Sequence, residues 1–152
     1  MQNKQLKTVL LAAGGIVGAG AVVGLILGFA LAEGKKDEGP VVSTSSGLQY
    51  IDQRVGDGPV AKNGDRVQVH YLGTLSDGTK FDASRDRGAP LDYHIGVDPV
   101  VEGWKEGIIG MKVGGKRKLL VPAKLGYGAE GRKPSIPPNA DLVFEIELLR
   151  IL

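Results

Sequence analysis

The chain has 152 residues, of which 19 are basic and 17 acidic, and it contains no cysteine. A net charge of +2 argues against a nucleic-acid-binding protein, which needs a clustered basic excess. Without cysteine the chain has neither disulfides nor a thiol nucleophile, and its length suits a single domain with a short appendage.

The first distinctive segment is apolar, since residues 8–32 contain no charged side chain. As a helix this segment would measure roughly 37 Å, enough to cross a hydrocarbon core of about 30 Å. Lys4 and Lys7 precede it, and basic residues tend to stay in the cytoplasm. We therefore expect residues 1–32 to be a transmembrane anchor, with the domain that follows exported to the extracytoplasmic side of the membrane.

The same segment permits a second interpretation, a signal peptide that is removed from the mature protein. Ala30 and Ala32 place small side chains in the small-x-small pattern of a cleavage site. Cleavage after Ala32 would leave the domain soluble in the periplasm or lumen. Residues 33–46 mix charges with Gly39, Pro40 and hydroxyl side chains, and we expect them to be a flexible linker.

Residues 47–152 alternate apolar and polar side chains in several stretches, which predicts half-buried strands. Val67, Val69 and Tyr71 form one such stretch, and Asp77-Gly78 then favours a hairpin turn. Further strands are expected at 80–83, 91–95, 116–121 and 142–151, with an edge strand at 47–55.

One short helix is predicted, because apolar side chains recur three or four residues apart from Val101 to Met111. Asp98 is expected to cap it, with Pro99 at the first helical position. These elements predict an α+β domain, a five- or six-stranded antiparallel sheet wrapped around one short helix and preceded by the apolar N-terminal helix. Trp104 would be buried between helix and sheet.

Few residues offer covalent or metal chemistry. His70 and His94 are the only histidines, and no metal-ligand spacing occurs, so no metal or cofactor is expected. Ser84, Asp82 and His70 suggest a hydrolase triad, but strand alternation turns His70 to the face opposite Tyr71, and no Gly-x-Ser-x-Gly motif is present. What remains is a set of aromatic side chains with one carboxylate.

The segment 122–139 fits neither the helical nor the strand period and is rich in glycine and proline. A loop of this length inside a compact domain is usually functional or disordered. Tyr127 and Ile136 within it predict order and contact with another group.

Several blocks of sequence decide whether these aromatic side chains form only a hydrophobic core or also a functional site. They are Val69-His70-Tyr71-x-Gly73-x-Leu75-x-Asp77-Gly78-x-x-Phe81-Asp82-x-Ser84, Gly103-Trp104-x-x-Gly107, Met111-x-Val113-Gly114, Tyr127-Gly128 and Ile136-Pro137-Pro138-Asn139-Ala140-x-Leu142-Val143-Phe144. In order and spacing, almost from Gly47 to the C-terminus, these blocks resemble the FKBP family of peptidyl-prolyl cis/trans isomerases.

The resemblance implies a pocket between sheet and helix that binds X-Pro segments, with Trp104 as its floor. It implies hydrogen bonds to ligand carbonyls from the Tyr127 hydroxyl and the Val101 backbone N–H, and an Arg87 that orients Asp82. The implied catalytic residues are Tyr71, Asp82, Trp104, Tyr127 and Phe144. The implied substrate-binding residues are Phe81, Arg87, Leu91, Val100, Val101 and Ile136. The implied partners are proline-containing polypeptides and macrolides, without a cofactor.

An apolar pocket suffices for this reaction, because it disfavours the charge-separated planar amide more than the twisted one. Leu91, Val101, Arg132 and Ser135 depart from the residues usual in the family, which affects the expected ligand affinity more than the activity. Two other functions stay open: a chaperone or binding module that uses the pocket without turnover, and a membrane-anchored domain that only docks a partner.

Overall fold

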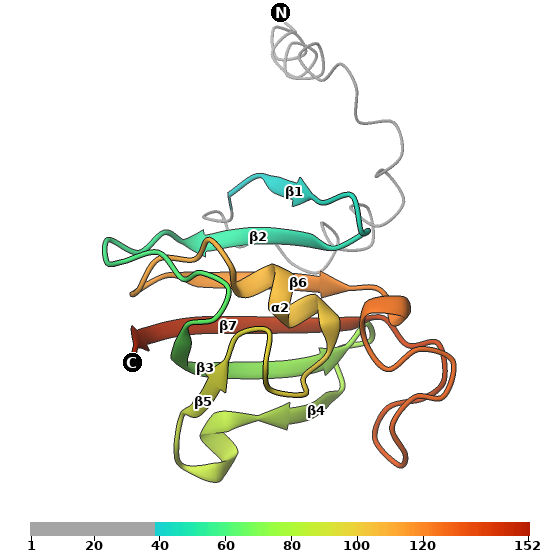
Figure 1. Cartoon of the computed structure of the whole chain (residues 1–152). Helices are drawn as coiled ribbons and strands as arrows, with labels where there is room; N and C mark the ends of the chain where they lie inside the picture. The colour runs from blue at the N-terminus through green and yellow to red at the C-terminus, as the bar shows by residue number, and fades with distance from the viewer. Residues whose placement is uncertain (1–38) are drawn as a thin grey trace, which may run out of the picture. The chain divides into compact units, whose positions relative to one another are not determined.

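The computed structural model describes residues 39–152, which form one antiparallel sheet with a short helix on one face (Figure 1). The strands are β1 (Val41–Ser43), β2 (Gln49–Arg54), β3 (Arg66–Leu75), β4 (Lys80–Ala83), β5 (Leu91–His94), β6 (Lys116–Val121) and β7 (Leu142–Ile151). The helix is α2 (Glu102–Ile108), and short 3-10 helices span Ser84–Arg87 and Ala123–Leu125. The expected N-terminal helix lies outside the described residues. Within residues 39–152, no helix is long and apolar enough to cross a membrane.

The sheet runs in the order β1-β2-β6-β7-β3-β4, and β5 pairs with β3 as well. β3 and β7 are the longest strands and are neighbours, with Tyr71 opposite Ile146 and Gly73 opposite Phe144. Inward side chains of both strands are buried and alternate with partly exposed ones, as the period of two requires. The core therefore lies on the inner face of this central pair.

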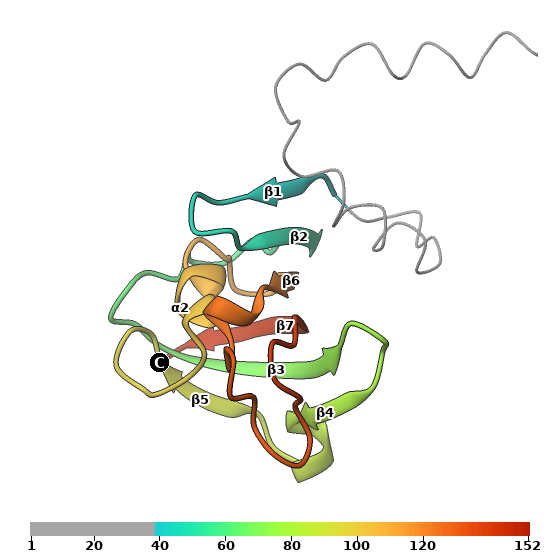
Figure 2. The same ribbon diagram turned by 90° about the vertical axis from the view of Figure 1, so that its right-hand side faces the viewer.

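α2 lies against that inner face, as the side view shows (Figure 2). Gly103 and Gly107 face β6, where a Cβ atom would come within 2.7 Å of Val121 and 2.5 Å of Leu119. Glycine at these two positions therefore lets the helix backbone approach the sheet closely. Trp104, between them in sequence, is only 2% exposed, which confirms its expected burial.

Two expectations about this fold need correction. The sheet of the described residues has seven strands rather than five or six, because β1 forms within the expected linker and pairs Val41 with Ile51. β2 is consequently not an edge strand. The helix begins at Glu102 with Val101 as its N-cap, and the Asp98 carboxylate instead accepts a 2.8 Å hydrogen bond from the His94 backbone N–H.

Candidate functional site

Trp104 lies at the centre of a layer of aromatic side chains between α2 and the sheet. The rings of Tyr71, Tyr93 and Phe144 meet it in T-shaped arrangements, with centroids 4.9, 5.8 and 5.4 Å away. Phe81 extends the layer, because its ring centroid lies 5.6 Å from that of Phe144. Each such pair adds about 0.5–1.5 kcal/mol beyond the burial of its area, so the layer holds Trp104 in one orientation.

The apolar side chains expected at the site pack together in or against one hydrophobic cluster. The buried members are Tyr71, Val101, Trp104, Ile136 and Phe144, and the partly buried members are Phe81, Leu91, Val100 and Tyr127. Ile136 is only 2% exposed, so its side chain anchors the long loop to the core. The partly buried members form the edge of this cluster that is open to solvent.

Asp82 on β4 and Arg87 at the end of the following 3-10 helix are connected to this layer through the Tyr71 hydroxyl. The hydroxyl donates to Asp82 Oδ2 over 2.6 Å, and Arg87 Nη1 donates to Asp82 Oδ1 over 2.6 Å. Arg87 Nη2 donates to the Tyr71 hydroxyl oxygen. The three side chains form a closed ring in which the Tyr71 hydroxyl both donates and accepts.

These contacts shift the pKa of each member of the ring. Burial raises the pKa of Tyr71, and the hydrogen bond to Asp82 adds to this while Arg87 opposes it. Burial also acts to raise the pKa of Asp82, but hydrogen bonds from Tyr71 and Arg87 outweigh it and leave this pKa below its usual value. Hydrogen bonds to Tyr71 and Asp82 raise the pKa of Arg87. At neutral pH the ring holds a neutral phenol and two opposite charges that balance.

Ser84 and His70 form a separate hydrogen-bonded pair behind this layer. Ser84 is fully buried, and its Oγ lies 2.8 Å from His70 Nδ1 and accepts the Tyr71 backbone N–H over 2.9 Å. Asp82 bonds to Tyr71 and Arg87 instead of His70, so the three residues do not make a hydrolase triad. Ser84 rather ties the 3-10 helix that carries Arg87 to β3.

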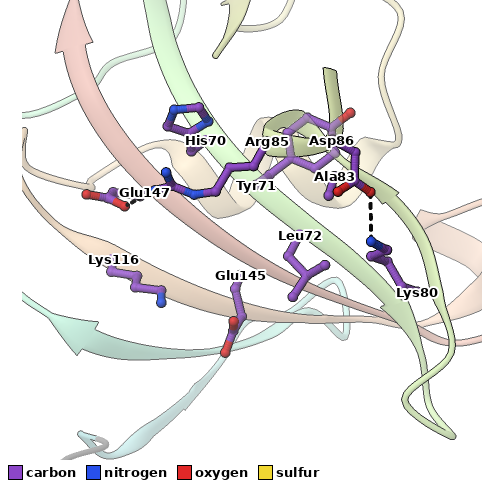
Figure 3. A pocket seen from close by; sticks show the side chains of 10 residues that line it. All are labelled: His70, Tyr71, Leu72, Lys80, Ala83, Arg85, Asp86, Lys116, Glu145 and Glu147. Atoms are coloured by element: carbon purple, nitrogen blue, oxygen red, sulfur yellow. Dashed lines mark hydrogen bonds and ion pairs between the residues drawn. The ribbon is translucent and has the colours of Figure 1, made fainter. Parts of the chain in front are cut away.

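On the outer face of the sheet, a groove of about 340 Å³ is lined largely by charged side chains and also by His70 (Figure 3). Arg85 reaches Glu147 at 3.4 Å, and Lys80 pairs with Asp86 at 2.8 Å. The position of His70 here confirms that it faces away from the aromatic layer. Because four of the charged side chains of this groove form these two ion pairs and it lacks an aromatic layer, we place the candidate site on the inner face.

The connection between β6 and β7 carries Tyr127 and Ile136, and its own backbone hydrogen bonds order it. Near its start, the Gly128 N–H donates to the Ala123 carbonyl over 2.8 Å. Arg132 and Ile136 exchange two backbone hydrogen bonds of 2.9 and 2.8 Å, which close the tip of the loop. The order expected from the sequence is therefore confirmed.

Two side chains next to the site were not expected to belong to it. Tyr93 packs against Trp104, and the pattern contains a signal for this, because Tyr93 and Leu91 are two residues apart on one strand. Arg132 Nη1 donates to the Tyr127 hydroxyl over 3.2 Å, and the sequence contains no signal for that contact.

The antiparallel sheet, the short helix packed on it and the aromatic layer around Trp104 define an FKBP-like domain. Residues 58–149 match the family described as FKBP-type peptidyl-prolyl cis-trans isomerase. The chain belongs to the FKBP-type peptidyl-prolyl cis-trans isomerase family, as the sequence motifs indicated.

Individual proteins show the same likeness. An FK506-binding protein of Neisseria meningitidis serogroup B is 51% identical over 105 residues, which are 69% of this chain and 96% of that protein. FK506-binding protein 4 of Dictyostelium discoideum is 49% identical over 120 residues, which are 79% of this chain but only 32% of that longer protein. The crystal structure of AtFKBP13 matches with a TM-score of 0.70 and 39% identity, over 74% of this chain and 99% of that one.

Proposed function

We propose that this chain accelerates the cis/trans isomerisation of X-Pro bonds in exported polypeptides and so assists their folding. The observation that carries the proposal is the aromatic layer around Trp104, whose partly exposed edge adjoins a carboxylate neutralised by Arg87. Family membership supplies the reaction class.

The chemistry follows from the amide itself. Rotation about the X-Pro bond faces a barrier of about 18–20 kcal/mol because of amide resonance, which puts partial charges on nitrogen and oxygen of the planar form. Transfer from water to an apolar site penalises that polar form. The twisted transition state has lost much of the charge separation, so an apolar site binds it better than the planar ground state. No nucleophile takes part.

Each side chain then has a distinct role. Trp104 would be the surface on which the prolyl ring rests. The Tyr127 hydroxyl and the Val101 backbone N–H would donate to the carbonyl groups that flank the rotating bond and hold them in place. The surrounding apolar wall would consist of Tyr71, Phe81, Leu91, Val100, Ile136 and Phe144.

The hydrogen-bonded ring of Tyr71, Asp82 and Arg87 supports this division of labour. The Tyr71 hydroxyl already donates its proton to Asp82 and accepts from Arg87, so it offers nothing further to a substrate carbonyl. Tyr71 therefore serves as part of the apolar wall, and Tyr127 serves as the hydrogen-bond donor to the substrate. Asp82, balanced by Arg87, would add little net charge to a site that must stay apolar.

The same surface suits macrolide ligands. Two of the relatives are named FK506-binding proteins. We extend that property to this chain, because an apolar macrolide would cover the same partly exposed side chains as a prolyl segment. Proline-containing polypeptides would be the natural partners, and neither a cofactor nor a nucleic acid has a role in this proposal.

We further propose that residues 1–32 hold the isomerase domain, residues 47–152, outside the cytoplasm. The support is the uncharged segment of residues 8–32 and the lysines before it. N-terminal sequencing of the mature protein distinguishes the two forms: a retained Met1 indicates a membrane anchor, and a new N-terminus at Glu33 indicates cleavage.

The isomerase proposal is tested with the purified full chain and a proline peptide whose cis and trans forms are followed in time. Tyr127→Phe removes one hydrogen bond, and since such bonds contribute about 0.5–1.5 kcal/mol, we expect kcat/KM to fall about 2- to 10-fold. Asp82→Val and Trp104→Leu should each lower it about tenfold or more, because they disturb the wall and the surface beneath the proline. Val55→Ser, at an exposed position, serves as the control.

Full activity in all three variants would remove this assignment of the site. Peptide binding without any acceleration by the wild-type chain would instead indicate a binding module or chaperone.

A further inference from the structure

The guanidinium of Arg132 contacts the hydroxyl and the ring of Tyr127. Arg132 Nη1 lies 3.2 Å from the Tyr127 hydroxyl oxygen, within hydrogen-bond distance. The guanidinium carbon lies 5.8 Å from the centroid of the Tyr127 ring, which is within the range of a cation–π contact. One cation thus touches both the polar end and the ring of the residue proposed as the substrate's hydrogen-bond donor.

The backbone of the loop places Arg132 for this contact. The Gly131 N–H donates to the Tyr127 carbonyl over 3.1 Å, so the chain folds back directly after the tyrosine. Arg132 is then fixed by its two backbone hydrogen bonds to Ile136, whose side chain is buried in the core. None of these bonds uses the Arg132 side chain, so the backbone geometry does not depend on the guanidinium.

The direction of the hydrogen bond follows from the chemistry of the two groups. A guanidinium has only N–H donors and no acceptor, so the Tyr127 oxygen must accept. The hydroxyl proton of Tyr127 is then directed away from Arg132. Among residues 39–152, no protein acceptor is recorded for that proton, which contrasts with Tyr71, whose proton is donated to Asp82.

We propose that Arg132 is a positioning residue that orients the Tyr127 hydroxyl so that its proton points to a substrate carbonyl. This inference rests on the proposed isomerase function and on Tyr127 as a donor in it. The positive charge beside the oxygen also draws electron density from the hydroxyl, which strengthens it as a donor. Arg132 acts through Tyr127 and need not touch the substrate.

The neighbouring Lys133 provides a matched control. It lies on the same loop, is exposed and carries the same charge, but among the described residues only Arg132 donates to the Tyr127 hydroxyl. Arg132→Met and Lys133→Met each remove one positive charge and keep an apolar stem. If the charge of the loop had a general effect, kcat/KM would change equally in both variants. If Arg132 orients the Tyr127 hydroxyl, kcat/KM changes only in Arg132→Met.

The experiment measures kcat and KM for isomerisation of a proline peptide by five forms of the full chain: wild type, Arg132→Met, Lys133→Met, Tyr127→Phe and the Arg132→Met/Tyr127→Phe double variant. We expect Arg132→Met to lower kcat/KM about 2- to 10-fold, the range of one hydrogen bond. Lys133→Met should match wild type. In the Tyr127→Phe background, where no hydroxyl is left to orient, Arg132→Met should change kcat/KM by less than about 1.5-fold.

The double-variant comparison separates this role from a purely structural one, since a structural contribution of Arg132 would persist in the Tyr127→Phe chain. An equal loss in both backgrounds overturns the proposal, as does an equal loss for Lys133→Met. If the wild-type chain does not accelerate isomerisation, the proposed function fails and this assignment fails with it. If wild type is active and Arg132→Met is unchanged, only the assignment of Arg132 fails.

Discussion

The Tyr71 hydroxyl uses both of its hydrogen-bonding capacities inside the protein, which ties a buried ring to a half-exposed ion pair. Asp82 and Arg87 retain side-chain exposures of 36% and 51%, so water screens their attraction. The pKa of Asp82 nevertheless lies below its usual value, because Tyr71 and Arg87 donate to the charged carboxylate. The folded state therefore favours the ionised form of Asp82.

This preference predicts a pH-dependent stability. Because the pKa of Asp82 is lower in the folded than in the unfolded chain, its stabilisation is present above the unfolded value and is lost as pH falls through the folded value. Asp82→Asn should lower the free energy of unfolding at pH 7 by about 0.5–1 kcal/mol, after allowance for screening. The difference from wild type should shrink at pH 2.5, as measured by urea denaturation.

Asp86→Asn is the control for this prediction, since within residues 39–152 the one ion pair of Asp86 is an exposed pair with Lys80. Its effect at pH 7 should be below about 0.5 kcal/mol. A deficit of Asp82→Asn that is the same at both pH values would show that the carboxylate charge is not what stabilises the ring.

At the residue scale, the sequence motifs selected the residues of the candidate site but few of the contacts between them. Tyr71, Asp82 and Trp104 were found through motif spacing, and the structure brings them together. The sequence argued against a hydrolase triad at Ser84, and in the structure its hydroxyl is buried and bonded to the Tyr71 backbone and to His70. Arg132 was recognised only as a departure from the residue usual in the family, because its contact with Tyr127 depends on how the loop folds back.

At the scale of elements, the position of α2 depends on Arg117, a buried cation that no sequence pattern singled out. Arg117 on β6 is only 6% exposed, and its Nη1 donates to the carbonyls of Gly107 at 3.1 Å and Ile109 at 3.4 Å. The end of a helix leaves such carbonyls without helical partners. Arg117 also donates twice to the Asp52 carboxylate and stacks over the Tyr50 ring.

We therefore predict that Arg117→Met lowers the free energy of unfolding by about 2–4 kcal/mol, because helix-end carbonyls and the Asp52 carboxylate lose a largely buried donor. Arg54→Met removes an exposed arginine that pairs with Glu147 and should cost less than about 1 kcal/mol. Urea denaturation of both variants provides the measurement. Equal losses of unfolding free energy in the two variants would mean that the burial of Arg117 does not strengthen its contacts.

The loop between β6 and β7 depends on a glycine at its turn. Gly131 has φ +67, and a Cβ there would lie 2.4 Å from the Ile136 carbonyl oxygen. Gly131→Ala should destabilise the fold by more than the roughly 1 kcal/mol of left-handed backbone strain, because the loop backbone must also shift to relieve this contact. That shift would move Tyr127, so kcat/KM should fall as well. Gly64→Ala is the control: Gly64 also has a positive φ, +89, but a Cβ there would meet no atom within 4 Å, so this variant measures the backbone strain alone. Similar stability and activity in both variants would show that the loop tolerates the contact.

Element prediction succeeded where burial is periodic and failed where it is not. The alternation in β3 and β7 reflects one buried face, so the pattern identified both strands. β1 has only three residues and too little pattern to reveal itself. Asp98 had the residue type of a helix cap, but it belongs to the turn after β5 and accepts from the His94 N–H, while α2 begins after Val101 without a side-chain cap.

For the molecule as a whole, the matched family region is smaller than the unit that folds. Residues 58–149 match the family, whereas β1 and β2 lie before them. β2 pairs with β6 and supplies the Asp52 that holds Arg117. The first two strands therefore support the helix that carries Trp104, and a chain truncated to the matched residues would lose that support.

The site as a whole is tested by ligand-linked stability. A ligand that binds only the folded state stabilises it by about 2.7 kcal/mol at one hundred times its dissociation constant. For a domain of this size, we expect FK506 at that concentration to raise the melting temperature of the full chain by on the order of 10 °C. Trp104→Leu removes the side chain at the centre of the aromatic layer and should abolish most of this shift, even though its own melting temperature starts lower. An undiminished shift in Trp104→Leu would place the macrolide elsewhere, and no shift in wild type would show that the layer around Trp104 does not accept it.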